Sequence, residues 1–185
     1  MEYVEALKDI KQINAIKRYL KKHSERDYVL FTLGINTGLK ITEILKIRVE
    51  DVLDEDGVKN FYLLPHHDKT KEIYLNHKVK QAIIHYIQNQ ELTKEDFLFK
   101  SPRTSQPITR QQAYRIIHQA AEAIGIVGKI GTNSMRKTFG YHAYKRGIAI
   151  SILKEHFNHS TPSETLKYIG ISKTEKIRTE IDVNL

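Results

Sequence analysis

The chain has 185 residues, of which 40% are hydrophobic and 28% charged, so it has the composition of a folded protein with one compact domain or two small ones. It contains no cysteine, which excludes disulfides, cysteine-ligated zinc and a thiol nucleophile and is compatible with a cytoplasmic location. The net charge of +8 favours a polyanionic partner, with nucleic acid the first candidate and an acidic membrane surface the second.

Neither a secretion signal nor a membrane span is recognisable. Residues 1–11 mix acidic and apolar side chains and lack the apolar core of a signal peptide. The longest apolar stretch, residues 28–39, is too short to cross a bilayer and contains Asn36 and Thr37.

The first quarter of the chain has helical patterns. Apolar side chains that share one face predict an amphipathic helix over residues 5–22. Ser24 resembles the first residue of a capping box, and the helix after it is apolar nearly all round over residues 28–35, so we expect it to be buried. Gly38 ends this helix, and another begins near Ile41.

Residues 49–76 change from a helical to an extended pattern. An acidic turn ending at Gly57 precedes two short strand-like runs, residues 61–64 and 73–75. A polar, basic loop, residues 66–72, separates the two runs. The pattern predicts a small antiparallel sheet inserted in a helical protein.

The remainder of the chain is again helical in pattern. We expect helices at residues 78–89, from Thr109 to just before Gly125, from Thr132 onward, and at residues 150–156. Thr161 begins a last helix, with proline at the first helical position and a glutamate that completes the capping box. The tail, residues 171–185, is polar and is expected to be partly disordered or to dock on a neighbour.

Two patterns resemble ligand sites but lack the required spacing. Residues 125–132 hint at a phosphate-binding loop, but Lys129 is followed by Ile130 and the glycine spacing is absent. His156 and His159 are close enough to share a metal, yet the zinc-protease spacing and a third ligand are missing. The sequence therefore predicts no metal and no cofactor.

Two further segments place cations where a phosphate could bind. At Gly38 one helix ends and the next begins, with Lys40 at the junction, so backbone N–H groups and a cation form an anion site there. Lys69 and Lys71 lie in the basic hairpin loop, from which a lysine can reach a bound phosphate. An exposed helix corner and a solvated hairpin are the ordinary alternatives.

Two more segments carry a conspicuous arginine and tyrosine. Arg136 falls near the first turn of a helix, where a cation is unfavourable beside the helix dipole, so either an anion or a carboxylate should lie nearby. Tyr168 follows His159 by nine residues, with a well-capped helix between them. By itself, such a tyrosine is most often a packing residue.

Together, and in this order, the four segments resemble the motif boxes of the tyrosine recombinase (phage integrase) family. The family's Thr-Gly-Leu-Arg-x-x-Glu box is matched by residues 37–43, with Lys40 in place of arginine. Its Lys-Thr-Lys hairpin loop is matched by residues 69–71. Its His-x-x-Arg box is matched by residues 133–136, with Asn133 in place of histidine.

The fourth family box is Leu-Gly-His-Ser, with a tyrosine nine residues after the histidine. Residues 157–160 and Tyr168 match it, and the resemblance covers about residues 5–172. The resemblance implies an α+β, mainly α, catalytic domain over residues 1–172 with a small three-stranded antiparallel sheet. It also implies that the tail, residues 173–185, docks on a neighbouring protomer.

The resemblance implies a site-specific enzyme of a mobile element that cleaves and rejoins double-stranded DNA through a 3′-phosphotyrosyl bond, without metal or cofactor. The resemblance also implies a homo-tetramer on DNA, with the chain alone a monomer or weak oligomer, and no membrane partner. By the same resemblance, Tyr168 is the nucleophile, Arg136 clamps a phosphate oxygen, His159 donates a hydrogen bond to the phosphate, and Lys69 is the general acid for the leaving 5′-oxygen.

The altered and supporting positions follow from the same comparison. Lys40 offers a point charge instead of the planar arginine fork, and Asn133 keeps hydrogen bonding but loses acid–base capacity. Glu43 is expected to orient the first-box cation, and Lys71 and Lys137 are expected to contact DNA.

Three functions remain open from the sequence. The leading one is an active recombinase or integrase. Lys40 and Asn133 favour an alternative, a catalytically impaired DNA-binding protein on a recombinase fold. The third is a basic helical protein unrelated to DNA. The chain is expected to be either a single-domain member of the family or a fragment lacking a core-binding domain.

Overall fold

The computed structural model describes residues 3–172, 174–175 and 182–184. Most of the predicted tail, residues 173–185, lies outside the described residues, and so does its expected docking on a neighbour. Within the part of the chain that is described, no helix combines the length and the apolar character needed to cross a membrane.

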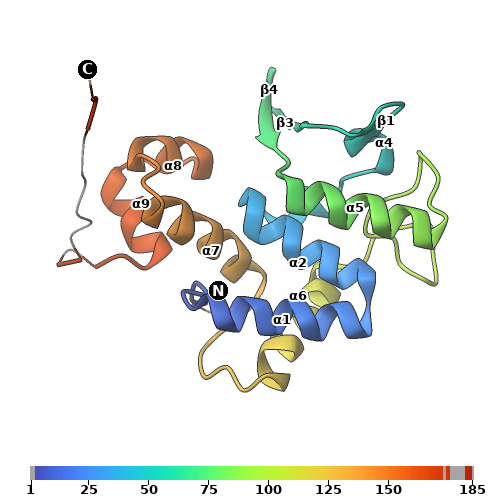
Figure 1. The fold of residues 1–185 in the computed structure, drawn as a ribbon, viewed down its shortest axis with the longest axis horizontal. Helices are drawn as coiled ribbons and strands as arrows, with labels where there is room; N and C mark the ends of the chain where they lie inside the picture. The colour runs from blue at the N-terminus through green and yellow to red at the C-terminus, as the bar shows by residue number, and fades with distance from the viewer. Residues whose placement is uncertain (1–2, 173, 176–181, 185) are drawn as a thin grey trace.

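The larger part of the molecule is a group of helices around α2 (Glu25–Thr37), as Figure 1 shows. α2 packs against α1 (Ile10–His23), α5 (His77–Gln90) and α7 (Thr132–Lys145). α6 (Arg110–Ala123) packs against α1 and α7. The predicted burial of α2 is confirmed, because side chains on all its sides are buried: Val29, Leu30, Phe31, Thr32 and Leu33.

Most helix starts lie where local capping signals predict them. Thr109 and Gln112 form the expected capping box of α6, and the Thr161 hydroxyl accepts a hydrogen bond from the Glu164 N–H at the start of α9 (Pro162–Ile169). α1 starts later than the predicted residue 5, because the Asp9 carboxylate accepts from the Lys11 N–H and caps the helix there.

The predicted antiparallel sheet is present as two separate hairpins. β1 (Leu53–Asp54) pairs with β2 (Gly57–Val58), and β3 (Phe61–His66) pairs with β4 (Lys69–Tyr74). Among the described residues the sheets thus have two strands each, in place of the one three-stranded sheet that we expected. Each hairpin is extended by one further hydrogen bond, from the Lys59 N–H to the Val52 carbonyl in the first and from the Leu75 N–H to the Asn60 carbonyl in the second.

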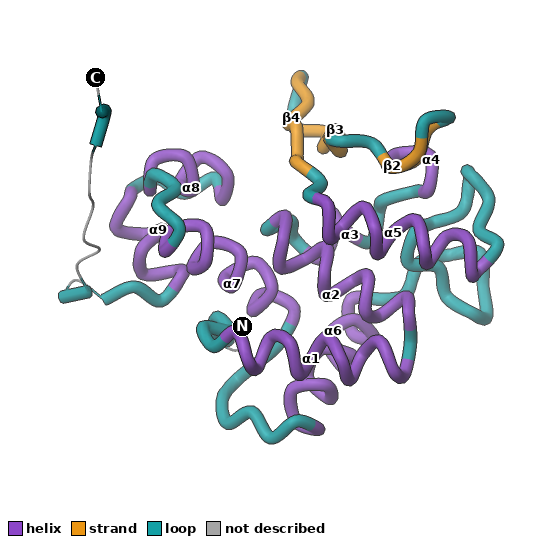
Figure 2. Tube along the Cα trace, viewed as in Figure 1, coloured by secondary structure: helices purple, strands orange, loops and turns teal. Residues whose placement is uncertain are grey.

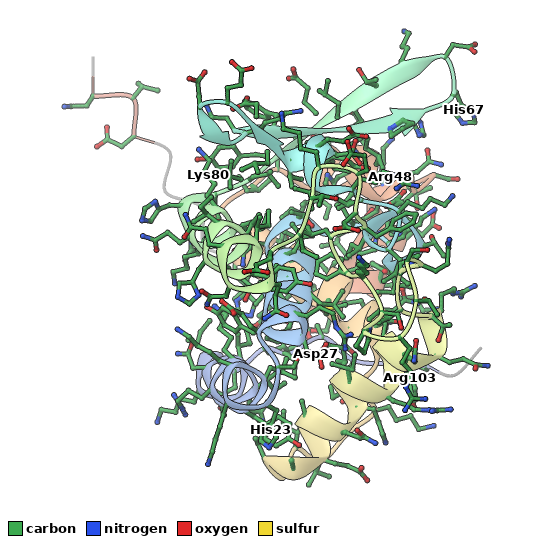
Figure 3. All side chains as sticks on the ribbon, turned by 90° about the vertical axis from the view of Figure 1, so that its right-hand side faces the viewer. His23, Asp27, Arg48, His67, Lys80 and Arg103 are labelled. Carbon is green, nitrogen blue, oxygen red and sulfur yellow. The ribbon has the colours of Figure 1, made fainter. Side chains whose placement is uncertain are left out.

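The β3–β4 hairpin projects from the helices (Figure 2), and Figure 3 shows His67 at its free end. His67 has a positive φ of 51°, which allows the tight turn between the two strands. Side chains alternate between the two faces, so Leu64, Lys71 and Ile73 turn toward the body of the molecule.

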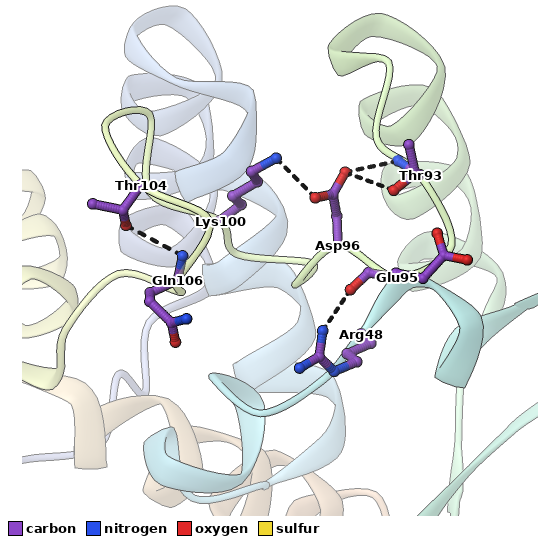
Figure 4. Close-up of polar contacts among 7 residues, drawn as sticks. All are labelled: Arg48, Thr93, Glu95, Asp96, Lys100, Thr104 and Gln106. Carbon is purple, nitrogen blue, oxygen red and sulfur yellow. Dashed lines mark hydrogen bonds and ion pairs between the residues drawn. The ribbon is translucent and has the colours of Figure 1, made fainter.

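Two short helices, α3 (Ile41–Ile44) and α4 (Val49–Val52), connect α2 to the hairpins. The long connection from α5 to α6 is attached near them (Figure 4). The Arg48 guanidinium donates to the Glu95 carbonyl over 2.5 Å, and the Asp96 carboxylate pairs with Lys100 over 2.8 Å. The Arg48 contact and the hydrogen bond from the Leu98 N–H to the Ile47 carbonyl, 2.8 Å long, attach the connection to the chain before α4. The Asp96–Lys100 pair lies within the connection.

At the other end of the molecule, α7 leads to α8 (Ile150–Phe157) and α9, which share a small core of Leu153, Phe157, Ile169 and Ile171. Gly140 lets α7 and α9 approach closely, because a Cβ there would lie 2.5 Å from Ile169 and 2.7 Å from Phe157. The close approach sets the position of Tyr168, the residue before Ile169.

Candidate active site

All four sequence boxes contribute residues to one cleft of about 290 Å³ between the β3–β4 hairpin, the start of α3, α7 and the end of α8. Its lining residues include Lys40, Glu43, Lys69, Lys71, Arg136 and His156. Tyr168 and His159, from the fourth box, stand beside Arg136 rather than among these lining residues. The tertiary structure thus brings cations from three distant segments together.

Arg136 lies at the centre of the arrangement and is half-buried. Its Nε–H donates to the Gly38 carbonyl over 3.0 Å, and a terminal N–H₂ group donates to the Phe157 carbonyl over 3.3 Å. It also hydrogen-bonds the Tyr168 phenol, and among the described residues no carboxylate forms an ion pair with it. The guanidinium is therefore oriented by neutral groups and keeps its charge for an anion.

Tyr168, on α9, packs beside this arginine. The Arg136 guanidinium lies 5.9 Å from the centre of the Tyr168 ring, and the rings of Tyr168 and Phe157 are 5.3 Å apart. Burial raises the pKa of the Tyr168 phenol, and the charge of Arg136 and its hydrogen bond to the phenol act in the opposite direction. The arginine thus favours the phenolate that a nucleophilic tyrosine needs.

His159 lies on the same side, with its ring centre 4.9 Å from that of Tyr168. Its Nδ1 is 3.0 Å from the Thr165 hydroxyl, and this contact orients the ring. Burial lowers the pKa of His159 and Arg136 lowers it further, whereas Glu164 raises it. His159 is therefore neutral at neutral pH and keeps one N–H to donate.

The two hairpin lysines differ in environment although they share one face of β4. Lys69 is exposed beside the hairpin tip, paired with His66 across the strands. Lys71 is half-buried, and its Nζ donates to the His156 carbonyl over 2.9 Å. Burial, followed by the charge of Arg136, lowers the pKa of Lys71.

The first box forms a turn in which only glycine fits at position 38. Gly38 has a φ of 67°, and a Cβ there would lie 2.4 Å from the Phe139 ring. After this turn the Glu43 carboxylate accepts a hydrogen bond from the Lys40 backbone N–H over 2.8 Å, which leaves the exposed Lys40 side chain at the cleft. Glu43 therefore supports the turn through the main chain.

Comparison with known proteins decides what this arrangement is. The sequence pattern of the phage integrase family matches residues 6–175. The chain belongs to the phage integrase family. Members of this family are tyrosine recombinases, which break and rejoin DNA strands. The chain is 42% identical over 176 residues to the probable integrase/recombinase YoeC of Bacillus subtilis, covering 94% of this chain and 93% of YoeC.

Solved recombinase structures share the fold. The XerA recombinase matches with a TM-score of 0.77 at 17% identity, over 94% of this chain and 61% of XerA. The XerH recombinase, in a post-cleavage complex with a palindromic difH substrate, matches with a TM-score of 0.73 at 17% identity, over 91% of this chain and 49% of XerH. The chain therefore spans about half to three-fifths of these two recombinases. The expected mainly α recombinase catalytic fold is confirmed.

Within this phage integrase domain, the two remaining candidates differ in placement. Asn133 is half-buried, one helical turn before Arg136 on α7. Lys137 is only 7% exposed, and its Nζ donates to the Val4 carbonyl over 2.8 Å. The expectation that Lys137 contacts DNA stays a prediction, and in this structure its ammonium is bound to the Val4 carbonyl. One residue along a helix turns the side chain by about 100°, so Arg136 lines the cleft while Lys137 is buried. The Lys137 ammonium nevertheless lies 5.0 Å from the centre of the Tyr168 ring.

His156 lines the cleft, although the sequence suggested only a weak metal pair with His159. Its Nε2–H donates to the Thr37 carbonyl over 2.7 Å, while His159 contacts Thr165. The described residues contain no group of three possible metal ligands. The sequence gives little indication that His156 belongs to the cleft, because its hydrogen-bond partner Thr37 lies 119 residues away.

Proposed function

We propose that the chain is a site-specific recombinase or integrase that cleaves and rejoins double-stranded DNA in the cytoplasm through a 3′-phosphotyrosyl bond to Tyr168. The observation that carries the proposal is the placement of Arg136 between Tyr168 and the cleft. Its guanidinium is oriented by two carbonyls, and Lys40, Lys69 and Lys71 line the cleft beside it. A phosphodiester is an anion that suits this set of cations.

The chemistry follows from these residues. The Tyr168 oxygen attacks the phosphorus, a bond from the phosphorus to the tyrosine forms, and the bond to the 5′-oxygen breaks. Lys69 gives a proton to the leaving 5′-oxygen, and the phenolic proton passes to water. Arg136, Lys40 and a hydrogen bond from His159 stabilise the charge that develops on the phosphoryl oxygens. A 5′-hydroxyl of the partner strand reverses the step, so the number of ester bonds is unchanged.

The assembly is part of the same proposal. We infer that four copies act on two duplexes, and that the tail, residues 173–185, docks on the next protomer. The XerH relative was solved on its DNA substrate, which supports duplex DNA as the ligand. A cross-linking experiment with and without DNA tests the stoichiometry, and a dimer as the largest DNA-bound species would contradict it.

The test of the proposed reaction is covalent attachment to a nicked duplex. A library of nicked sequences from the DNA that flanks the gene is incubated with the chain, and the products are resolved on a denaturing gel. The wild-type chain should give a protein–DNA band, and Tyr168→Phe should give none while it still retards DNA on a native gel. A band that persists in Tyr168→Phe would show that another residue is the nucleophile.

The matched control is Tyr144→Phe, because Tyr144 packs against the same small core as Tyr168. Among the described residues the rings that lie against the Arg136 guanidinium are those of Phe157 and Tyr168. This variant should retain the covalent band. The alternative function, a DNA-binding protein without cleavage, is favoured by Lys40 and Asn133, and predicts retardation without any covalent band in the wild-type chain.

A further inference from the structure

We propose that His156 is a positioning residue of this reaction, which holds the turn at Thr37 and the cations Arg136 and Lys71 in one arrangement. The inference rests on the proposed function, because its consequence is the rate of strand cleavage. His156 touches no reacting atom in the proposal and acts through the groups that it holds.

The side chain of His156 supports the end of α2. The last carbonyls of a helix have no partner within the helix, and Thr37 is the last residue of α2. The His156 Nε2–H donates to this carbonyl over 2.7 Å. The next carbonyl, that of Gly38, accepts from the Nε–H of Arg136 over 3.0 Å. A shift of this turn would therefore move the acceptor that orients Arg136.

The main-chain carbonyls of His156 and the next residue also bind cations of the cleft. The His156 carbonyl accepts from Lys71 Nζ over 2.9 Å, and the adjacent Phe157 carbonyl accepts from Arg136 over 3.3 Å. Two pairs of consecutive carbonyls, at residues 37–38 and 156–157, thus accept four hydrogen bonds from three side chains. His156 is the residue that takes part in both pairs, once through its ring and once through its main chain.

The ring also fills the space between α2 and α7. Its centre lies 5.0 Å from that of the Phe139 ring. A Cβ on Gly38 would lie 3.0 Å from the His156 Nε2 and 2.4 Å from Phe139. The glycine, the imidazole and the phenyl ring therefore fit together closely, and the ring orientation is set by packing as well as by the hydrogen bond.

The imidazole supplies this hydrogen bond without adding charge. Burial, followed by the charge of Lys71, lowers the pKa of His156 to about 4, and Arg136 contributes in the same direction against the effect of the Thr37 carbonyl. The ring is therefore neutral at neutral pH. A third positive charge beside Lys71 and Arg136 would be costly, and a neutral donor avoids it.

The test uses two substitutions at this position and one matched control. His156→Leu keeps similar bulk but removes the donor, and His156→Gln keeps an N–H group at a similar reach. The control is His142→Leu, because the His142 Nε2 donates to the Leu7 carbonyl over 2.8 Å and its ring is also half-buried, but it does not line the cleft. Circular dichroism gives the folded fraction of each variant.

The readouts are the single-turnover rate of covalent attachment per folded molecule and the DNA dissociation constant from a native gel. We expect His156→Leu to lower the rate by about 10- to 100-fold, because small misplacements of catalytic groups have effects of this size. The dissociation constant should stay within about threefold of the wild-type value. His156→Gln should restore most of the rate, and His142→Leu should leave it unchanged.

Three results would overturn the inference. These are a wild-type rate in His156→Leu, an equal loss of rate in His142→Leu, and a loss in His156→Leu that lies wholly in DNA affinity. In each of these cases the wild-type chain still forms the covalent product, so the proposed function stands. If the wild-type chain forms no covalent product on the library, the proposed function fails and the inference fails with it.

Discussion

Replacement of Lys137 tests whether its buried position persists on DNA. Lys137→Met keeps the length of the side chain and removes its charge. The substitution removes the hydrogen bond to the Val4 carbonyl, 2.8 Å long. It also removes two ring contacts, with Tyr3 at 4.3 Å and Tyr168 at 5.0 Å from the ammonium to the ring centre. A hydrogen bond from a charged group contributes about 1.5–3 kcal/mol, and an exposed cation–π contact about 0.5–1 kcal/mol.

A compensating gain reduces this loss. Burial lowers the pKa of Lys137, which shows that the folded chain bears a cost for the buried ammonium. Methionine removes that cost, so the net loss in the free energy of unfolding should be smaller than the sum of the lost contacts. For a chain of this size each kcal/mol lost should lower the midpoint of thermal unfolding by about 2–4 °C. Differential scanning calorimetry at pH 7 measures the change.

The DNA assay separates a buried lysine from one that contacts DNA. Each phosphate contact contributes about −0.9 to the slope of log K against log salt concentration. Lys137→Met should leave this slope unchanged, whereas Lys69→Met, at the exposed cleft position, should make it less steep by about 0.9. A loss of about 0.9 in Lys137→Met would refute the reasoning, because it would mean that Lys137 leaves the Val4 carbonyl and reaches DNA.

Two further substitutions address charge in the cleft. The pKa of His156 in the folded chain is about 4, below its ordinary value of 6.5, so the unfolded chain takes up the proton first as the pH falls. The contribution of His156 to the free energy of unfolding is therefore fully present above pH 6.5 and is lost as the pH drops toward 4. This dependence should shrink in urea titrations of His156→Gln, and an identical pH profile would show that another group titrates. Lys40→Arg should raise the rate of covalent attachment by about tenfold, because arginine adds a planar bidentate donor, and an unchanged rate would show that the cleft does not use this position for the phosphate.

Features that depend on neighbours in the chain were predictable. The capping boxes at Thr109 and Thr161 act over three residues, so the starts of α6 and α9 follow from sequence alone. The burial of α2 follows from its apolar composition. The family boxes also follow from sequence, because each is a short run of residues in a set order. The catalytic roles of their residues remain proposals until the covalent band is tested.

Features that depend on distant partners were not predictable in the same way. The described strands form two separate hairpins, and the local strand patterns do not indicate which strands pair. Arg136 had two explanations from its position near a helix start, an anion or a carboxylate, and only the fold shows that two carbonyls orient it. The burial of Lys137 also depends on the fold, because its ammonium donates to the Val4 carbonyl, 133 residues away in the chain.

The sequence by itself determined the family, the order of the elements and the residue types available for phosphate chemistry, because these depend on local patterns and on short motifs. The tertiary structure alone decided which cations share a cleft and which one is buried. It also decided that His156 supports the turn at Thr37, a contact across 119 residues. The physical reason is that a hydrogen bond or a buried charge depends on what lies within a few ångströms in space, wherever that partner lies in the chain.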